Sequence, residues 1–204
     1  LRQALNRFVE LMHRDNNIAI FGLAQRPTIL TDYTHSLEQL KAAIGTVFPQ
    51  SGSGMTLMDA LVEVPRGLER REASRAALVA LITDGPEQGN FDDGSVLKAM
   101  NKAGVSLHAV TVGHFSSTLP DPERYRMIVL ANGTRNTGGR HDNLMAASGW
   151  PRALERLARD LSSQYKVVYS RPPSLIQPES VQVSVIRPGL SARSTPERLA
   201  GGRR

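Results

Sequence analysis

The chain of 204 residues contains no cysteine. This absence excludes disulfide bonds, thiol catalysis and metal sites built on cysteine, although it does not indicate a compartment. The five histidines are scattered, and none forms the His-Glu-x-x-His pair that would bind a catalytic zinc ion. No apolar run is long enough to cross a bilayer, so we expect no membrane span.

Several motifs of nucleotide and hydrolytic enzymes are also missing. The serine-hydrolase pattern Gly-x-Ser-x-Gly is absent. The glycine-rich residues 51–54 could form a phosphate-binding loop, but Met55-Thr56 follow where such a loop needs a lysine to reach the phosphates. Asp92-Asp93-Gly94 opens like a calcium loop but lacks the later ligands, so we expect it to cap a helix.

The net charge of +6 raises the question of a nucleic-acid partner. Residues 171–204 hold six arginines and two glutamates, so this segment alone contributes +4 of that charge. No helix shows a basic stripe with interleaved aromatic residues. The pattern therefore favours a solvated basic tail, which we expect to be disordered over 191–204, and no nucleic-acid partner.

The periodicity of the apolar residues indicates an α/β protein. It predicts helices over residues 1–14, 37–47, 57–71, 96–102 and 150–162, and strands over 18–23, 28–33, 78–83, 105–112, 165–169 and 181–186; residues 126–131 fit either. This order fits a doubly wound, Rossmann-like sheet that is mostly parallel with one antiparallel edge strand. We expect an α/β domain over 1–165 and a short β-extension over 166–190.

Two stretches point to a binding site. The apolar run 77–83 stops on Asp84-Gly85, which is typical of a strand buried on both faces in the middle of a parallel sheet. Ligands bind beyond the carboxyl ends of such strands. If the loop 51–56 lies there too, the hydroxyl of Thr56 and the carboxylate of Asp84 suit a divalent cation with oxygen ligands. Thr56 could instead cap the next helix, and Asp84 could simply leave the strand in a turn.

The same residues carry a family resemblance. Gly54-Met55-Thr56, Asp59-Ala60-Leu61 and Leu81-Ile82-Thr83-Asp84-Gly85 resemble the second and third motifs of a von Willebrand factor type A (VWA) domain, and Gly138-Gly139 with residues 181–189 resembles the VWA-related proteins of acidobacterial type. The resemblance implies a metal-ion-dependent adhesion site that binds Mg²⁺, or Mn²⁺ or Ca²⁺, and through it an Asp or Glu carboxylate of a partner protein. It implies that Thr56 and Asp84 are metal ligands, that Ser53, Gly54 and Gly85 form the rim, and that the protein is extracytoplasmic.

One motif of that family is missing. Its Asp-x-Ser-x-Ser loop follows a first strand that lies between the strands expected here at 18–23 and 78–83. Each backbone group left buried and unpaired costs about 1–3 kcal/mol, so either the natural protein is longer or the two flanking strands pair directly. We favour the first, and expect weak or no metal binding by this sequence. Two other functions stay open, an α/β enzyme acting on a phosphorylated or nucleotide ligand at the same strand ends, and a metal-free scaffold.

Overall fold

The fold is taken from a computed structural model that describes residues 1–48, 54–73, 75–83, 85–113, 120–165 and 183–194. The helices are α1 (Arg2–Met12), α2 (Leu37–Gly45), α3 (Leu57–Arg70), α4 (Asp93–Ala103), α5 (Asp121–Ile128), the π-helical turn η1 (Val129–Gly133), α6 (Thr134–Asn136), the 3₁₀ turn η2 (Ala147–Gly149) and α7 (Trp150–Ser162). The strands are β1 (Ile18–Leu23), β2 (Pro27–Thr34), β3 (Ala77–Ile82), β4 (Ser106–Val112) and β5 (Arg140–Leu144).

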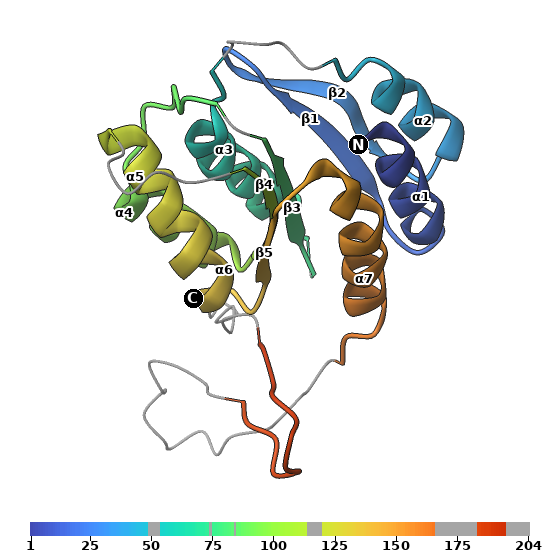
Figure 1. The fold of residues 1–204 in the computed structure, drawn as a ribbon, viewed down its shortest axis with the longest axis vertical. Coiled ribbons are helices and arrows are strands. Elements are labelled where there is room, and N and C mark those ends of the chain that lie inside the picture. Colours follow the sequence, from blue (N-terminus) through green and yellow to red (C-terminus); the bar gives the residue numbers. More distant parts are fainter. Residues whose placement is uncertain (49–53, 74, 84, 114–119, 166–182, 195–204) are drawn as a thin grey trace, which may run out of the picture.

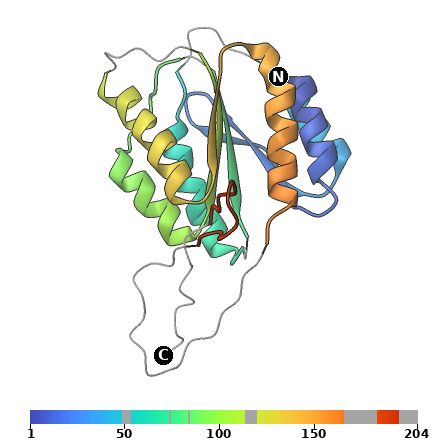
Figure 2. The same ribbon diagram turned by 60° about the horizontal axis from the view of Figure 1, so that its bottom comes forward.

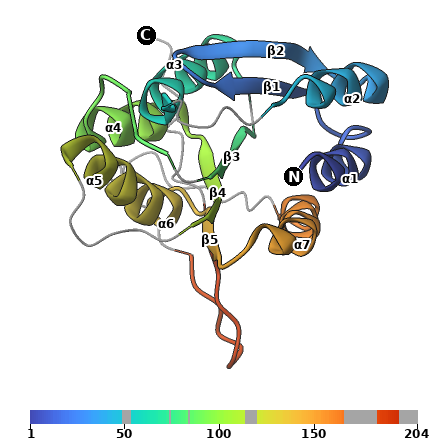
Figure 3. The same ribbon diagram turned by 45° about the horizontal axis from the view of Figure 1, so that its top comes forward.

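The strands form two sheets. β3, β4 and β5 make a parallel sheet in that order, whereas β1 and β2 form an antiparallel hairpin. Figure 3 shows the hairpin beside β3 but separate from it. The expected α/β fold with parallel strands and an antiparallel edge is confirmed. In the described part of the chain, however, β1 and β3 do not pair with each other. The alternative that these two flanking strands pair directly is therefore not observed there.

Helices cover both faces of the parallel sheet (Figures 1 and 2). On one face, Val110 of β4 packs in a core with α1, α2 and α7, and Trp150 of α7 is almost fully buried there. On the other face, Leu107 and Ala109 of β4 pack against α3, α4 and η1. Successive residues of a strand point to opposite faces, so β4 contributes to both cores and is the central strand of this sheet.

The prediction that the 77–83 run forms a strand was correct, but the prediction that this strand is buried on both faces in the middle of the sheet was wrong. β3 lies at one end of the parallel sheet, and its residues Val79 and Leu81 are only half-buried. All six residues of β1 are half-buried too, although the strand is apolar apart from its glycine. The reason is that the edges of β1 and β3 pair with no strand within the described ranges, so the apolar side chains near them are not fully covered.

Local capping signals set several helix boundaries, and Asp92 caps a helix as expected. The backbone N–H of Ser95 donates to Oδ1 of Asp92 at 2.7 Å, so Asp92 caps α4, and Gly104 ends that helix with a φ of 63°. The Ser36 hydroxyl caps α2 in the same way by accepting from Gln39 N. Residues 126–131, for which helix and strand were both open, are helical.

The expected β-extension is not formed in its described part. Residues 183–186 belong to no strand, and Val183, Val185 and Ile186 are exposed. The strand expected over 165–169 lies outside the described residues except for Tyr165, which is not in a strand. Alternation of apolar residues predicts a strand only where a second backbone edge is present to pair with it.

No helix among the described residues is both long and apolar enough to span a membrane.

We predict that Gly139→Ala destabilises the fold. A Cβ at Gly139, which precedes β5, would overlap the carbonyl oxygen of Leu107, and backbone cannot move aside as a side chain can. We expect a loss of about 1–3 kcal/mol in the free energy of unfolding, measured by urea denaturation. Gly67→Ala in α3 is the matched control, since a Cβ there meets nothing within 4 Å and should add about 0.5–1 kcal/mol. Equal effects of both changes would contradict the tight packing at Gly139.

Candidate functional site

Thr56 lies between the end of β1 and the start of α3. Its side chain is buried, and its hydroxyl donates a hydrogen bond of 3.2 Å to the carbonyl oxygen of Ala24. Thr56 occupies the N-cap position of α3, but its side chain makes no capping hydrogen bond. The hydroxyl therefore uses its hydrogen on Ala24, and its oxygen lone pairs are not committed to the helix.

The loop after β3 runs alongside the loop before α3. Met55 N donates to Pro86 O at 2.9 Å, and Gln88 N donates to Met55 O at 2.8 Å, so that Met55 and Glu87 form an isolated parallel bridge. The backbone of Gly54 lies directly against the side chain of Gln88. These contacts join two segments that are about thirty residues apart in the sequence. Both segments lie above the end of β3 at which the loop 85–88 follows.

Glu87 caps α3 in place of Thr56. Its Oε1 accepts from the backbone N–H groups of Met58, at 3.3 Å, and Gly89, at 3.0 Å. Burial raises the pKa of this carboxyl, while the two backbone N–H groups and Arg126 act in the opposite direction. The side chain is fully buried, and its Oε2 has no hydrogen-bond partner among the described residues.

Arg126 supplies the positive charge beside Glu87. It projects from α5, is 4% exposed, and places Nη1 at 3.7 Å from Oε2 of Glu87. The same Nη1 donates to the carbonyl oxygen of Gly85 at 3.0 Å. One helical turn earlier, Glu123 accepts from the backbone N–H of Glu87 at 3.0 Å. Helix α5 therefore contacts the loop at two points on either side of Pro86.

A further carboxylate secures the far end of this loop. Asp59, in the first turn of α3, accepts from the backbone N–H of Asn90 at 2.7 Å and from its side-chain amide at 3.1 Å. With Glu87, this places two acidic side chains at the start of α3, where the helix dipole favours negative charge. Both are used to hold the loop.

Three of the five residues expected from the sequence are described by the structure. Thr56, Gly54 and Gly85 belong to the two adjoining loops, whereas Ser53 and Asp84 lie outside the described residues. Within the described ranges, no three His, Asp or Glu side chains gather in a way that could hold a metal ion.

Sequence reasoning missed Glu87, Glu123 and Arg126. One signal was present for the arginine, because Arg126, Val129 and Leu130 have the i, i+3, i+4 spacing of one helix face, and all three are buried. An arginine on an apolar face needs a buried partner. Nothing local in the sequence names Glu87 as that partner.

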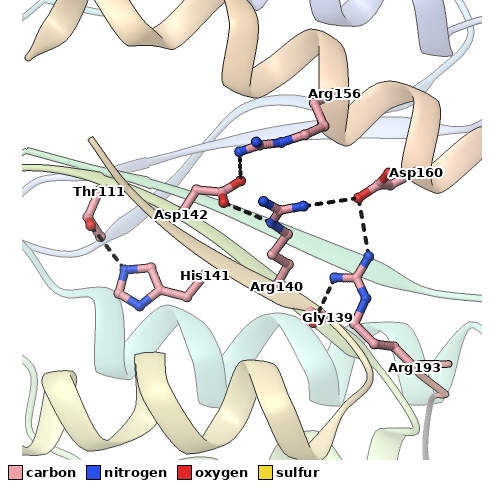
Figure 4. A network of polar contacts seen from close by, with 8 residues as sticks. All are labelled: Thr111, Gly139, Arg140, His141, Asp142, Arg156, Asp160 and Arg193. Carbon is pink, nitrogen blue, oxygen red and sulfur yellow. Dashed lines mark hydrogen bonds and ion pairs between the residues drawn. The ribbon is translucent and has the colours of Figure 1, made fainter. Parts of the chain in front are cut away.

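A second polar network lies between α7 and the parallel sheet (Figure 4). Asp142 of β5 binds Arg140 and Arg156, each at 2.8 Å, and Asp160 of α7 binds Arg193 at 3.2 Å. Arg193 also donates to Gly139 O at 3.2 Å. Arg193 was expected in the disordered tail, but these contacts attach its segment to the domain.

His108 is buried beside this network. It faces the same side of β4 as Val110 and pairs in register with Arg140. Neither ring nitrogen has a hydrogen-bond partner among the described residues. Burial, and then the charge of Arg193, lowers its pKa to about 4, against the smaller opposing effects of Asp160 and Asp142.

Comparison with known proteins adds the identity of the fold. No family model and no curated protein matches the chain. Among solved structures, it is similar to the conserved hypothetical protein BatB from Bacteroides thetaiotaomicron, with a TM-score of 0.58 and 16% identity over 79% of this chain and 84% of that one. A von Willebrand factor type A protein from Catenulispora acidiphila gives a TM-score of 0.56 and 11% identity over 77% of this chain and 37% of that one.

The VWA domain of SpRpn10 gives a TM-score of 0.54 and 12% identity over 76% of this chain and 80% of that one. The chain therefore has a VWA-like, Rossmann-type fold, as its motifs indicated. At these identities the similarity concerns the fold, and the chemistry of the site has to be argued from its own residues.

We predict that breaking the Glu87–Arg126 pair costs more than removing it. Arg126→Met leaves a buried carboxylate without its counter-charge and should lower the free energy of unfolding by about 3–5 kcal/mol. Adding Glu87→Gln removes that charge but keeps an oxygen for Met58 N and Gly89 N, so the double variant should recover most of the loss. Chemical denaturation of wild type, both single variants and the double variant gives the coupling energy. Simple addition of the two single effects would contradict a charge interaction.

We predict that His108 makes the fold sensitive to acid. Its pKa is about 4 in the folded chain and 6.5 when unperturbed, so between these values the unfolded state binds more protons. Stability from this group is thus complete above pH 6.5 and is lost as the pH falls towards 4, by on the order of 3 kcal/mol in total. Urea denaturation between pH 7 and 4.5 should show a flatter pH dependence in His108→Leu than in wild type. Identical slopes would contradict a buried neutral histidine.

Proposed function

We propose that this protein is a protein-binding module that uses a divalent cation, Mg²⁺ or Mn²⁺, to bind a carboxylate of its partner. In this proposal the hydroxyl of Thr56 and the carboxylate of Asp84 are cation ligands. Ser53, Gly54 and Gly85 form the rim against which the partner packs. The cation keeps one coordination position for an Asp or Glu of the partner, and the chain has no catalytic role.

The observation that supports the proposal is the pairing of Met55 with Glu87. It brings the residue before Thr56 alongside the loop after β3, at the end of a parallel strand where α/β folds bind ligands. The hydrogen bond from Thr56 to Ala24 also supports it, because a hydroxyl that donates to a carbonyl can still offer its lone pairs to a hard cation. Glu87 caps α3, so Thr56 is not needed for that purpose.

Two ligands do not complete such a site. The proposal therefore includes a further strand, ending in an Asp-x-Ser-x-Ser loop, that lies between β1 and β3 and pairs with both. The open facing edges of these strands and their half-buried apolar residues support this position. The loop adds a carboxylate and two hydroxyls, while Thr56 and Asp84 alone bind a cation weakly. The extracytoplasmic location that the VWA resemblance implies belongs to the same proposal.

We predict weak cation binding that depends on Thr56 and Asp84. Calorimetric titration of Mn²⁺ and of Mg²⁺ into the protein should give a Kd of roughly 10⁻³ M. Thr56→Val and Asp84→Ala should abolish the heat of binding, whereas Thr28→Val in β2 and Asp93→Ala in α4 should leave it unchanged.

Two results would contradict this function. The absence of binding to wild type would favour a metal-free scaffold. Hydrolysis of nucleotides or phosphoesters that is lost in Asp84→Ala would favour an enzyme acting at the same strand end.

A further inference from the structure

The guanidinium of Arg126 has a role that its ion pair does not explain. A buried charge is expensive to desolvate, and apolar side chains in place of both members of a buried ion pair would often serve stability as well. Arg126 nevertheless directs Nη1 to the carbonyl oxygen of Gly85 at 3.0 Å, which is closer than its 3.7 Å approach to Glu87. Its shortest contact is thus with the backbone of the loop after β3.

Helix α5 fixes this loop at a second backbone group. Glu123, three residues before Arg126, accepts from the backbone N–H of Glu87 at 3.0 Å. Residues three apart on a helix lie on the same face, so one rigid surface binds the oxygen of Gly85 and the nitrogen of Glu87. Pro86, between them, has a restricted backbone, so fixing both neighbours fixes its carbonyl group as well.

The carbonyl of Pro86 connects the loop to Thr56. It accepts from Met55 N at 2.9 Å, and Met55 immediately precedes Thr56. Four short links therefore lead from α5 to the candidate ligand. They are the hydrogen bond from Arg126 to Gly85, the peptide bond from Gly85 to Pro86, the hydrogen bond between Pro86 and Met55, and the peptide bond from Met55 to Thr56.

We propose that Arg126 is a positioning residue of the candidate site, which sets the position of Gly85 and Pro86 and, through Met55, that of Thr56. The coupling between α5 and the two loops stands independently of any cation, whereas its effect on cation binding rests on the proposed function. A change that loosens α5 loosens both loops, and a ligand bound at the loops stabilises α5 in return.

Hydrogen exchange of individual backbone amides tests the coupling. Arg126→Met combined with Glu87→Gln is the informative variant, since it removes both charges and retains an acceptor for Met58 and Gly89. We expect the amides of Met55 and Gln88, which bond across the two loops, to exchange about tenfold faster or more. Those of Met58 and Gly89 and those of helix α7 should keep their protection. Arg124→Met, which alters an exposed arginine on the same helix, is the control and should change none of them.

The outcome at Met55 and Gln88 decides the coupling. Wild-type protection of both amides in the double variant would overturn the proposal, because Gly85 would then be held without Arg126. Uniform loss of protection, including α7, would overturn it too, because Arg126 would then support the whole fold and not these loops.

Cation affinity tests the consequence for the site. The double variant should bind Mn²⁺ about 10–100-fold more weakly than wild type, which is the usual effect of losing a residue that orients a ligand. Faster exchange with unchanged affinity would keep the coupling but overturn the positioning role. If the wild type binds no Mn²⁺, both the proposed cation-dependent binding function and the positioning role are contradicted. Faster exchange in the double variant would then still establish the coupling between α5 and the two loops.

Discussion

Two backbone hydrogen bonds of Met55, one from its N–H to Pro86 and one to its carbonyl from Gln88, hold the loop before α3 against the loop after β3. Both loops are connections, and connections tolerate change unless their backbone groups are satisfied. Here they satisfy one another, so each is a support for its neighbour. The surface above β3 is consequently formed by two segments that are far apart in the chain, and neither segment would form it alone.

The cost of this arrangement falls on Glu87. Burial removes its carboxylate from water. This desolvation is unfavourable for the charged form and raises the pKa of Glu87. Two backbone N–H groups and the charge of Arg126 offset that cost, and all three also fix the loop in place. A polar network of this kind stabilises little beyond a well-packed apolar core, yet it specifies one arrangement of the loops. For the cation site that we propose, precise placement of the loops matters more than stability, because its ligands have to converge on one ion.

Local patterns in the sequence predicted what depends on local chemistry. Asp92 and Gly104 bound α4 as their residue types indicate, and the apolar periodicity located α1, α2, α3, α4 and α7. It did not locate the helical stretch from α5 to α6, within which only residues 126–131 were considered, as either helix or strand. Properties that depend on distant partners were not predictable in the same way. The full burial expected for β3 requires a neighbouring strand on its open edge. The alternating residues 183–186 form no strand, because no neighbouring strand pairs with them in the described residues. Glu87 caps a helix that begins thirty residues before it, a relation that no spacing rule contains. The adjacency of the two loops was expected only because the VWA motifs pair them.

The open edges of β1 and β3 raise the question of what keeps the hairpin in position, since no hydrogen bonds between strands join the two sheets in the described residues. Helices on both faces do so. Ile18 and Ile20 of β1 pack into the core that α1 shares with α7, and Phe21 packs with Val64 and Leu68 of α3 on the opposite face. Side-chain packing therefore fixes the hairpin while the backbone groups along both edges stay free for pairing. A strand entering between β1 and β3 would gain hydrogen bonds on both sides and cover half-buried apolar residues, with the helical layers already in place to receive it.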